Sequence, residues 1–332
     1  MKLCIIGAGA SGLLLILLLN QAAFPLESII CIDPYFDGGS LSRKWNTVIS
    51  NTPWSATLES IRTYLPKASI PAWAAALPPD STTPVSTISK LIRELVKPIL
   101  LKIQLIQARV KELSWSSNTK LWTIHASKTF DVNKIFLTNG SHPKVLDLSI
   151  PSIPLEVALD ARRLSSYIEP HQKVLVFGTQ HSGSIVMKNL LDSSAYVTAI
   201  YKVGNPPFRF ARDGDYDGLK RDSAVFADDV MKGLYPIKTI ASDNLSEIVR
   251  ESRTADWVVY AIGFERNTIP IIIDGTPYAP VYDGHTGKLS CPNAWGFGIA
   301  YPSLAPDEIH WDVGISSFVE HISKQLDFII TL

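Results

Sequence analysis

Three glycines near the start of the chain, Gly7, Gly9 and Gly12, stand between an apolar stretch and a Leu-rich one. Their spacing suits a backbone that turns tightly, approaches a pyrophosphate closely and lets a helix pack against a strand. A second apolar stretch ends in Asp33, about 20 residues beyond the last glycine. The pattern predicts a strand, a helix and a strand over residues 2–6, 13–21 and 28–32. Together these features predict a dinucleotide-binding unit.

The start of that helix supplies the charge that a phosphate needs. The backbone N–H groups of Ala10 and Ser11 lack helical partners, and the helix dipole places partial positive charge at this end. Asp33 is suited to accept both hydrogen bonds of a ribose diol.

The same unit recurs, in a modified form, in the second half of the chain. The sequence predicts a strand, a helix and a strand over residues 173–177, 184–191 and 196–201. The intervening loop, Gly178 to Gly183, contains His181 and Ser182, which we interpret as cofactor-binding. For His181, a neighbour of a phosphate or a surface residue is favoured over an acid–base catalyst. Gln180 replaces the middle glycine and fills the space that a pyrophosphate approaches.

The second unit also differs where the ribose acid would stand. Its last strand is followed by Lys202 rather than by an acid, and Arg209 lies a few residues further on. A lysine fits a 2′-phosphate, so this unit favours NADPH over NADH, with Arg209 as a further phosphate partner.

Composition excludes several other classes of protein. The chain has 332 residues, enough for about two domains, and its 31 basic and 31 acidic residues leave no net charge. This balance argues against a nucleic-acid partner and leaves a small-molecule substrate. The three cysteines lie far apart and the histidines lack metal-ligand spacing, which predicts no metal site and a reduced, cytoplasmic compartment. The N-terminal apolar stretch is interrupted by glycines, so no stable membrane insertion is expected.

Segments between and after the two units complete the pattern. Residues 110–137 alternate and break like a small antiparallel meander, with strands at 110–115 and 121–125. A buried strand at 134–137 ends in Thr138-Asn139-Gly140. A strand at 257–260 leads to Ala261-Ile262-Gly263, the matching position of the second unit. Proline-containing links near 143–154 and 266–280 are predicted domain crossings.

In this order of motifs the chain resembles the two-dinucleotide-binding-domain flavoproteins, the superfamily of thioredoxin reductases and flavin-containing monooxygenases. The resemblance implies FAD and NADPH as cofactors and an α/β fold of two Rossmann-like domains, with parallel sheets and a small antiparallel meander. It implies that residues 1–150 and 275–332 form the FAD-binding domain, with an NAD(P)H-binding domain, residues 151–274, inserted between them.

Within that superfamily the residues favour the monooxygenase branch. A thioredoxin reductase carries a CxxC pair, and this chain has none. The stretch from Gly38-Gly39 through Trp45 to Asn51 is similar to the flavin-containing monooxygenase pattern, although the F-x-G-x-x-x-H marker of that group is missing. The resemblance implies that Asn51 is catalytic, beside the flavin. It assigns further cofactor contacts to Trp45, Gly140, Gly263, Gly298 and, at the start of a helix near residue 312, Gly314.

The implied function is a flavoprotein oxidoreductase in which NADPH reduces the flavin and a small nucleophilic or carbonyl substrate is oxygenated. Two alternatives stay open. One is an NAD(P)H-dependent flavin reductase or oxidase that inserts no oxygen, and the other is a non-catalytic FAD-binding protein with a degraded NADPH site. The sequence also leaves open whether the chain forms a homodimer.

Overall fold

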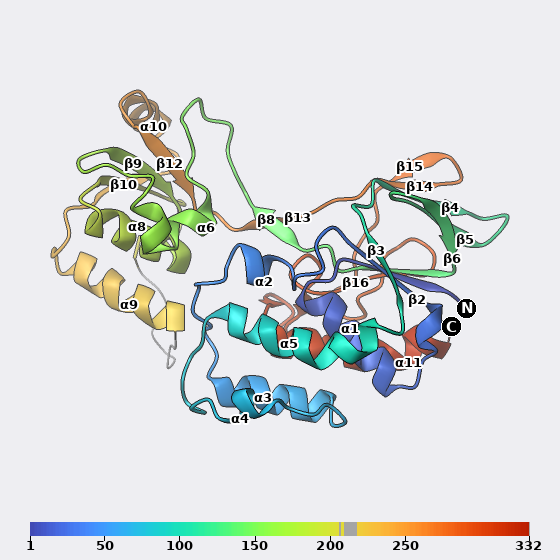
Figure 1. Cartoon of the computed structure of the whole chain (residues 1–332). Coiled ribbons are helices and arrows are strands. Elements are labelled where there is room, and N and C mark those ends of the chain that lie inside the picture. Colours follow the sequence, from blue (N-terminus) through green and yellow to red (C-terminus); the bar gives the residue numbers. More distant parts are fainter. Residues whose placement is uncertain (206, 209–217, 332) are drawn as a thin grey trace.

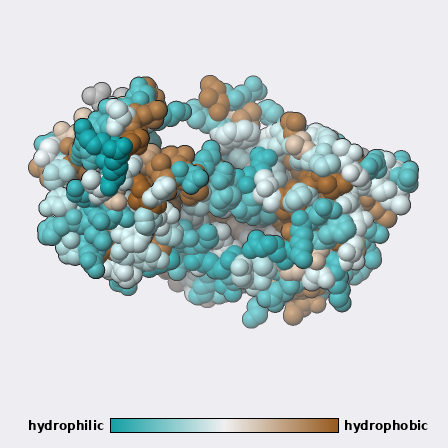
Figure 2. All heavy atoms as spheres, turned by 90° about the horizontal axis from the view of Figure 1, so that it is seen from above, coloured by the Kyte–Doolittle hydropathy of each residue, from teal (hydrophilic) through white to brown (hydrophobic). Residues whose placement is uncertain are grey.

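A computed structural model describes residues 1–205, 207–208 and 218–331, and it divides into two lobes (Figure 1). The larger first lobe contains both chain termini, and the second lobe lies at the other end of the molecule. Seen from above, the molecule is elongated and a gap opens through the surface between the second lobe and the rest (Figure 2). Because both termini lie in the first lobe, the chain crosses to the second lobe and back again.

The first lobe is built on a parallel sheet that is buried on both faces. Its strands, in spatial order, are β16 (Ala294–Gly296), β7 (Lys134–Leu137), β1 (Leu3–Ile6), β2 (Ile29–Asp33) and β3 (Gln104–Gln107). Its helices are α1 (Ala10–Gln21), the 3-10 turn η1 (Leu26–Ser28), α2 (Ser40–Arg43), α3 (Trp54–Tyr64), α4 (Ala72–Ala75), α5 (Val85–Leu100) and α11 (Ile315–Thr331).

Alternation along β1 explains why this short strand is wholly apolar. Leu3 and Ile5 of β1 face a core formed with α1, α3, α5 and α11, whereas Cys4 and Ile6 face a core formed with a second sheet. A strand covered on both faces needs apolar residues at every position. The second sheet, in the order β15 (Thr276–Tyr278), β14 (Ile271–Ile273), β4 (Glu112–Ser116), β5 (Leu121–His125) and β6 (Thr129–Val132), is the predicted meander with two added strands.

The second lobe repeats the layered arrangement on a smaller scale. Its parallel sheet has the order β11 (Lys238–Ala241), β10 (Tyr196–Tyr201), β9 (Lys173–Phe177) and β12 (Trp257–Tyr260). Its helices are α6 (Leu155–Ala158), α7 (Ala161–Leu164), α8 (His181–Asp192), α9 (Gly218–Met231) and α10 (Leu245–Ser252). As in β1, successive residues of β9 face opposite cores, Val174 and Val176 on one side and Leu175 and Phe177 on the other.

Two short antiparallel ribbons complete the fold. One pairs β8 (Ser141–Pro143) with β13 (Phe264–Arg266) where the chain crosses between the lobes. The other pairs β17 (Ser303–Leu304) with β18 (Trp311–Asp312) just before α11.

The predicted α/β class with parallel sheets and a meander is confirmed, and the predicted strands are present within two residues of their expected bounds. The helices start differently. The helices α1 and α8 begin three residues earlier than predicted, because the last glycine of each loop lies inside the first helical turn. The last helix begins at Ile315 rather than near Asp312, which is in β18.

The division at residues 150/151 and 274/275 remains a prediction. Because β14 pairs with β4 of the first lobe, we would place the second crossing at β13, before residue 271. The Leu-rich helix α1 is buried between the sheet, α5 and α11, which explains its unbroken apolar sequence. Within the described residues, no helix combines the length and the apolarity that crossing a bilayer requires.

A buried cation and a buried histidine fix α11 to the sheet. Lys134 of β7 is 1% exposed, and its ammonium donates to the carbonyl oxygen of Ile329 at 2.6 Å. This places positive charge at the negative end of the helix dipole. Further along α11, the ring of His321 is 5% exposed and meets Phe297 edge to face, with centroids 5.4 Å apart.

His321 makes the stability of the fold depend on pH. Burial, together with Lys324, lowers its pKa, while Asp283 and the carbonyl of His285 oppose the shift. Because the folded pKa lies below the unfolded value, the unfolded chain binds more protons, and stability falls as pH drops below about 6.5. We expect His321→Leu to remove up to about 1.4 kcal/mol per pH unit of this dependence. Urea unfolding of both proteins between pH 8 and 5 measures it; equal slopes would contradict the prediction.

Candidate functional site

The outer glycines of the first loop are required by the fold itself. Gly7 has φ +112°, and a Cβ there would overlap the carbonyl oxygen of Thr138 at the end of β7. A Cβ on Gly12 would overlap the carbonyl oxygen of Gly7. These contacts place the start of α1 directly against the ends of β1 and β7, as the fingerprint predicts.

Gly9, the middle glycine of the first loop, is not explained by backbone packing. Gly9 has φ −74°, a conformation open to any residue, and a Cβ there would meet no atom within 4 Å. Nothing in the fold therefore requires glycine at this position. The Gly38-Gly39 turn comes up beside it, with the Cβ position of Gly39 2.8 Å from the Cα of Gly9. The half-buried Ala10 and the buried Ser11 begin α1 at the same place. Gly9 thus leaves open space at a helix N-terminus, which is the cradle that a pyrophosphate needs.

Asp33 is tied to the same loop. One carboxylate oxygen accepts from the N–H of Ala8 at 2.8 Å, and the other accepts from Tyr35 at 2.7 Å and Phe36 at 2.8 Å. The side chain is 7% exposed. A carboxylate offers about four acceptor positions, so Asp33 retains capacity for a ribose hydroxyl while it fixes the loop. Its predicted role in binding a ribose stays a prediction.

The second loop has the same backbone. Gly178 has φ +99°, and a Cβ there would overlap the carbonyl oxygen of Ala261, while a Cβ on Gly183 would overlap that of Gly178. Gln180 has φ −83° and ψ −167°, close to the −74° and −174° of Gly9. The fold alone therefore accounts for both glycines that remain. The exposed Gln180 stands where the first loop is open.

The other residues predicted for the second unit lie in different surroundings near this loop. Ser182 lies half-buried in the first turn of α8, and Lys202 is exposed directly after β10. The imidazole of His181 is hydrogen bonded to Ser223 of α9 at 2.7 Å. Burial and, secondarily, the nearby Lys220 lower its pKa, which favours a neutral ring. Arg209 lies outside the described residues.

A segment of the first lobe, residues 44–51, lies against the second lobe. Trp45 packs on the second-lobe core and meets Phe264 edge to face, with centroids 5.6 Å apart. The side-chain oxygen of Asn51 accepts from the backbone N–H of Lys220 at 2.9 Å. Two of the residues predicted to contact the flavin therefore also join the lobes, and their contacts with a cofactor remain predictions.

The two motif ends that follow β7 and β12 lie at opposite ends of the ribbon of β8 and β13, Gly140 beside Asn267 and Gly263 beside Lys144. Gly140 and Gly263 have φ +71° and +92°, so both need glycine where the chain leaves its sheet. The carbonyl of Gly140 accepts from Asn267 at 3.0 Å, and Asn267 in turn donates its side chain to Asn139 at 2.7 Å. No local sequence signal points to Asn267, because it acts only through this long-range pairing.

Gly298, one of the predicted cofactor contacts, lies directly against the first glycine loop. A Cβ on Gly298, which has φ +88°, would overlap the side-chain oxygen of Ser11. Gly314 directly precedes α11 with open space around it, and its carbonyl accepts from Phe318 at 3.0 Å. The structure thus brings Gly298 to the loop of Gly9, while the role of Gly314 stays a prediction.

The cysteines form no reactive pair. Cys4, Cys31 and Cys291 are free and buried. Burial raises the pKa of each thiol, that of Cys291 to about 11 and those of Cys4 and Cys31 further. Buried thiols of this kind are poor nucleophiles.

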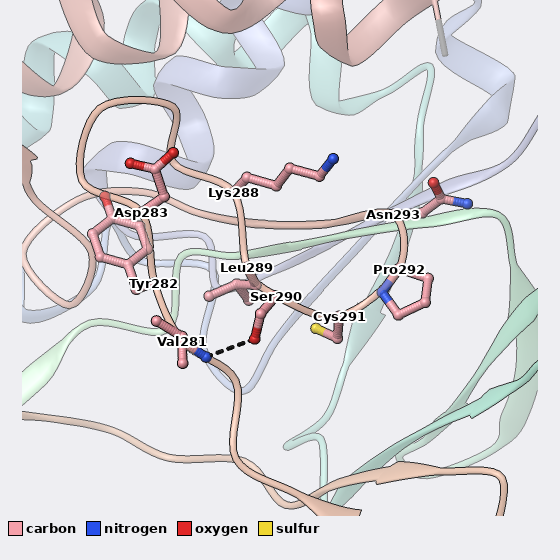
Figure 3. A pocket seen from close by; sticks show the side chains of 9 residues that line it. All are labelled: Val281, Tyr282, Asp283, Lys288, Leu289, Ser290, Cys291, Pro292 and Asn293. Carbon is pink, nitrogen blue, oxygen red and sulfur yellow. Dashed lines mark hydrogen bonds between the residues drawn. The ribbon is translucent and has the colours of Figure 1, made fainter.

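A groove of about 560 Å³ is lined by residues that belong to neither glycine loop (Figure 3). It follows one stretch of chain, residues 281–293, and none of the residues predicted from the sequence lines it. Lys288 and Asn293 extend from its rim, and the hydroxyl of Ser290 accepts from the N–H of Val281 at 2.8 Å. This surface is therefore distinct from the predicted nucleotide sites.

Comparisons with known proteins agree with this geometry. A relative from Paecilomyces divaricatus, named Monooxygenase AgnR1, is 25% identical over 375 aligned residues, which cover 96% of this chain and 95% of the relative. No model of a known protein family matches the chain.

Two solved structures share the fold at lower identity. The bacillithiol disulfide reductase Bdr (YpdA) of Bacillus cereus is 13% identical with a TM-score of 0.65, covering 99% of this chain and 98% of that one. OTEMO, solved as a complex with FAD and NADP, is 13% identical with a TM-score of 0.57, covering 98% of this chain and 83% of that one. The two-domain fold that the predicted resemblance implies is confirmed along nearly the whole chain.

The different reasons for Gly9 and Gly12 can be separated by substitution. We expect Gly9→Ala to change the free energy of unfolding of the ligand-free protein by less than about 1 kcal/mol, because its Cβ has room. Gly12→Ala should cost about 1–3 kcal/mol or more, because its Cβ overlaps backbone. Urea unfolding followed by circular dichroism measures both, and equal losses would refute the distinction.

Proposed function

We propose that this chain is an FAD-dependent oxidoreductase that uses NADPH to reduce its flavin and oxygenates a small nucleophilic or carbonyl substrate. The observation that carries the proposal is Gly9, the glycine of the first loop that the fold does not require. Its retention beside a helix N-terminus is accounted for by a phosphate-bearing ligand. The oxygenating branch is favoured by the monooxygenase relative, which is similar along nearly the whole chain.

The residues of the first lobe fit FAD. Gly9 lets a pyrophosphate approach the backbone, the N–H groups of Ala10 and Ser11 would bind it, and Asp33 would accept from the ribose. Gly298 closes the other side of this loop against Ser11. The N-terminus of α11, after Gly314, would stabilise negative charge on the ring system of the cofactor. Bound FAD would supply the redox chemistry, and the protein supplies orientation, charge and exclusion of water.

In the second lobe, the N-terminus of α8 would bind the phosphates of NADPH, with Lys202 near the 2′-phosphate. Gln180 requires the dinucleotide to lie further from the loop than FAD lies from Gly9, because its side chain occupies that space. Asn51, held on Lys220, lies between the lobes, where it would orient the reacting ends of the two cofactors.

One alternative is supported by a specific observation. Because the fold accounts for both Gly178 and Gly183, these glycines are no evidence for a nucleotide in the second lobe. Gln180 would then mark a protein that binds FAD but accepts no hydride from NADPH. An oxidase that reduces oxygen without inserting it is the other alternative.

An anaerobic titration with NADPH tests the proposal. We expect the purified protein to show the visible bands of oxidised flavin, and NADPH to bleach them. Gly9→Gln copies the second loop into the first and should abolish retention of flavin, whereas Gln180→Gly should keep the flavin and lower the NADPH concentration needed for half-bleaching.

A flavin that NADPH leaves oxidised in the wild type, but bleaches in Gln180→Gly, would establish the degraded-site alternative. Where bleaching occurs, oxygen is admitted with a panel of thioethers, amines and cyclic ketones. An oxygenated product in proportion to the NADPH consumed supports the monooxygenase; hydrogen peroxide alone, with every substrate, indicates the oxidase.

The cysteines separate this proposal from a disulfide reductase. Because all three thiols are buried with raised pKa values, we expect no NADPH-dependent reduction of a model disulfide. Iodoacetamide at pH 8 should alkylate the folded protein at least tenfold more slowly than the urea-unfolded protein. Rapid alkylation of one thiol in the folded state, together with disulfide turnover, would contradict the expectation.

A further inference from the structure

The first turn of α9 contacts both lobes at once. On one side, the N–H of Lys220 donates to the side-chain oxygen of Asn51 at 2.9 Å. Gly218 lies so close to the first lobe that a Cβ there would overlap the carbonyl oxygen of Ser50. The start of α9 is therefore seated on the loop that bears Asn51, and Figure 1 shows this end of α9 turned toward the first lobe.

On its other side, the same turn contacts the second glycine loop. The hydroxyl of Ser223 donates to the carbonyl oxygen of Lys220 at 2.8 Å and is 2.7 Å from Nδ1 of His181. Ser223 is 0% exposed. A serine hydroxyl has one hydrogen to donate. Both contacts are hydrogen bonds at once only when that hydrogen goes to the carbonyl of Lys220 and Nδ1 of His181 carries a hydrogen that it donates to Ser223.

These bonds form one continuous chain between the two sites. It runs from His181 at the start of α8, through the buried hydroxyl of Ser223 and the Lys220 residue, to Asn51. At Lys220 the path runs through the backbone, from its carbonyl to its N–H, so the start of α9 holds the His181 side and the Asn51 side together.

We propose that Ser223 is a positioning residue that fixes His181 in its Nδ1–H tautomer beside the second nucleotide loop and links that loop to Asn51. The proposal rests on the proposed function, because it assigns His181 to the site of NADPH. Ser223 itself touches no ligand. It sets which ring nitrogen of His181 is the basic one, and it holds the ring against the first turn of α9.

Two measurements on the flavin-loaded protein test this role. The first is the ¹⁵N spectrum of the imidazoles without nucleotide, with His181 assigned from the signal that His181→Asn loses. We expect the Nδ1–H tautomer in the wild type and its loss in Ser223→Ala. The second is the NADPH dependence of anaerobic flavin reduction.

In the second measurement, Ser223→Ala should raise the NADPH concentration for half-maximal reduction about 2- to 12-fold, the effect of one lost hydrogen bond. The limiting rate should change much less, and Ser223→Thr, which keeps the hydroxyl, should restore both readouts. Ser193→Ala is the matched control, because Ser193 also donates to a helix carbonyl, that of Asn189 at 2.9 Å, at the far end of α8. It should leave both readouts unchanged.

The outcomes separate the two proposals. If NADPH bleaches the flavin equally in the wild type and Ser223→Ala, or the tautomer is the same in both, the role of Ser223 is refuted while the proposed function stands. If NADPH fails to bleach the wild type, the proposed function fails first and the link to a nucleotide fails with it. Should Ser223→Ala not fold, Ser223→Cys and His181→Asn are expected to raise the half-maximal concentration instead, and an unchanged value in both refutes the proposal.

Discussion

The structure depends on a close backbone approach that occurs twice. Where β1 ends, the backbone at Gly7 packs against the carbonyl of Thr138, and where β9 ends, Gly178 packs against that of Ala261. No side chain fits between the strand ends at these points, so the chain must turn at once into a helix. Each helix N-terminus then lies at the carboxyl edge of a parallel sheet, where α/β folds place their ligands. The layers, the crossings and the sites follow from this packing.

This constraint also changes what the glycine fingerprint means. Its first and third glycines are demanded by the contact between strand and helix, whether or not a ligand binds. The fold does not require glycine at the middle position, because Gly9 and Gln180 have nearly the same backbone conformation. A sequence pattern counts all three alike, and only the contacts around each Cβ separate the evidence for a fold from the evidence for a ligand.

The sequence predicted the parallel strands because the buried residues at their centres, which are covered on both faces, form short apolar runs with clear ends. Lys173–Phe177 and Tyr196–Tyr201 have their predicted bounds for this reason. Both glycine loops were also predictable, since their signal is local. The partners of Asn51 and the pairing of Asn139 with Asn267 were not, because they join residues 169 and 128 positions apart. A three-residue ribbon such as β8 with β13 is too short to show a period.

Contacts between residues far apart in the sequence determine how the two predicted sites face each other. The segment 44–51 meets the second lobe through Lys44 with Glu156 at 3.4 Å, Thr47 with Asp160 at 3.1 Å, Trp45 and Asn51. Polar contacts of this type contribute about 1 kcal/mol or less each, far less than a buried sheet. Substitutions there can alter the relation between the two sites while both sheets stay intact. Under the proposed function one bound nucleotide reduces another, and that relation would set the reaction. The determinants of activity would then lie in these weak contacts rather than in the fingerprints that identify the fold.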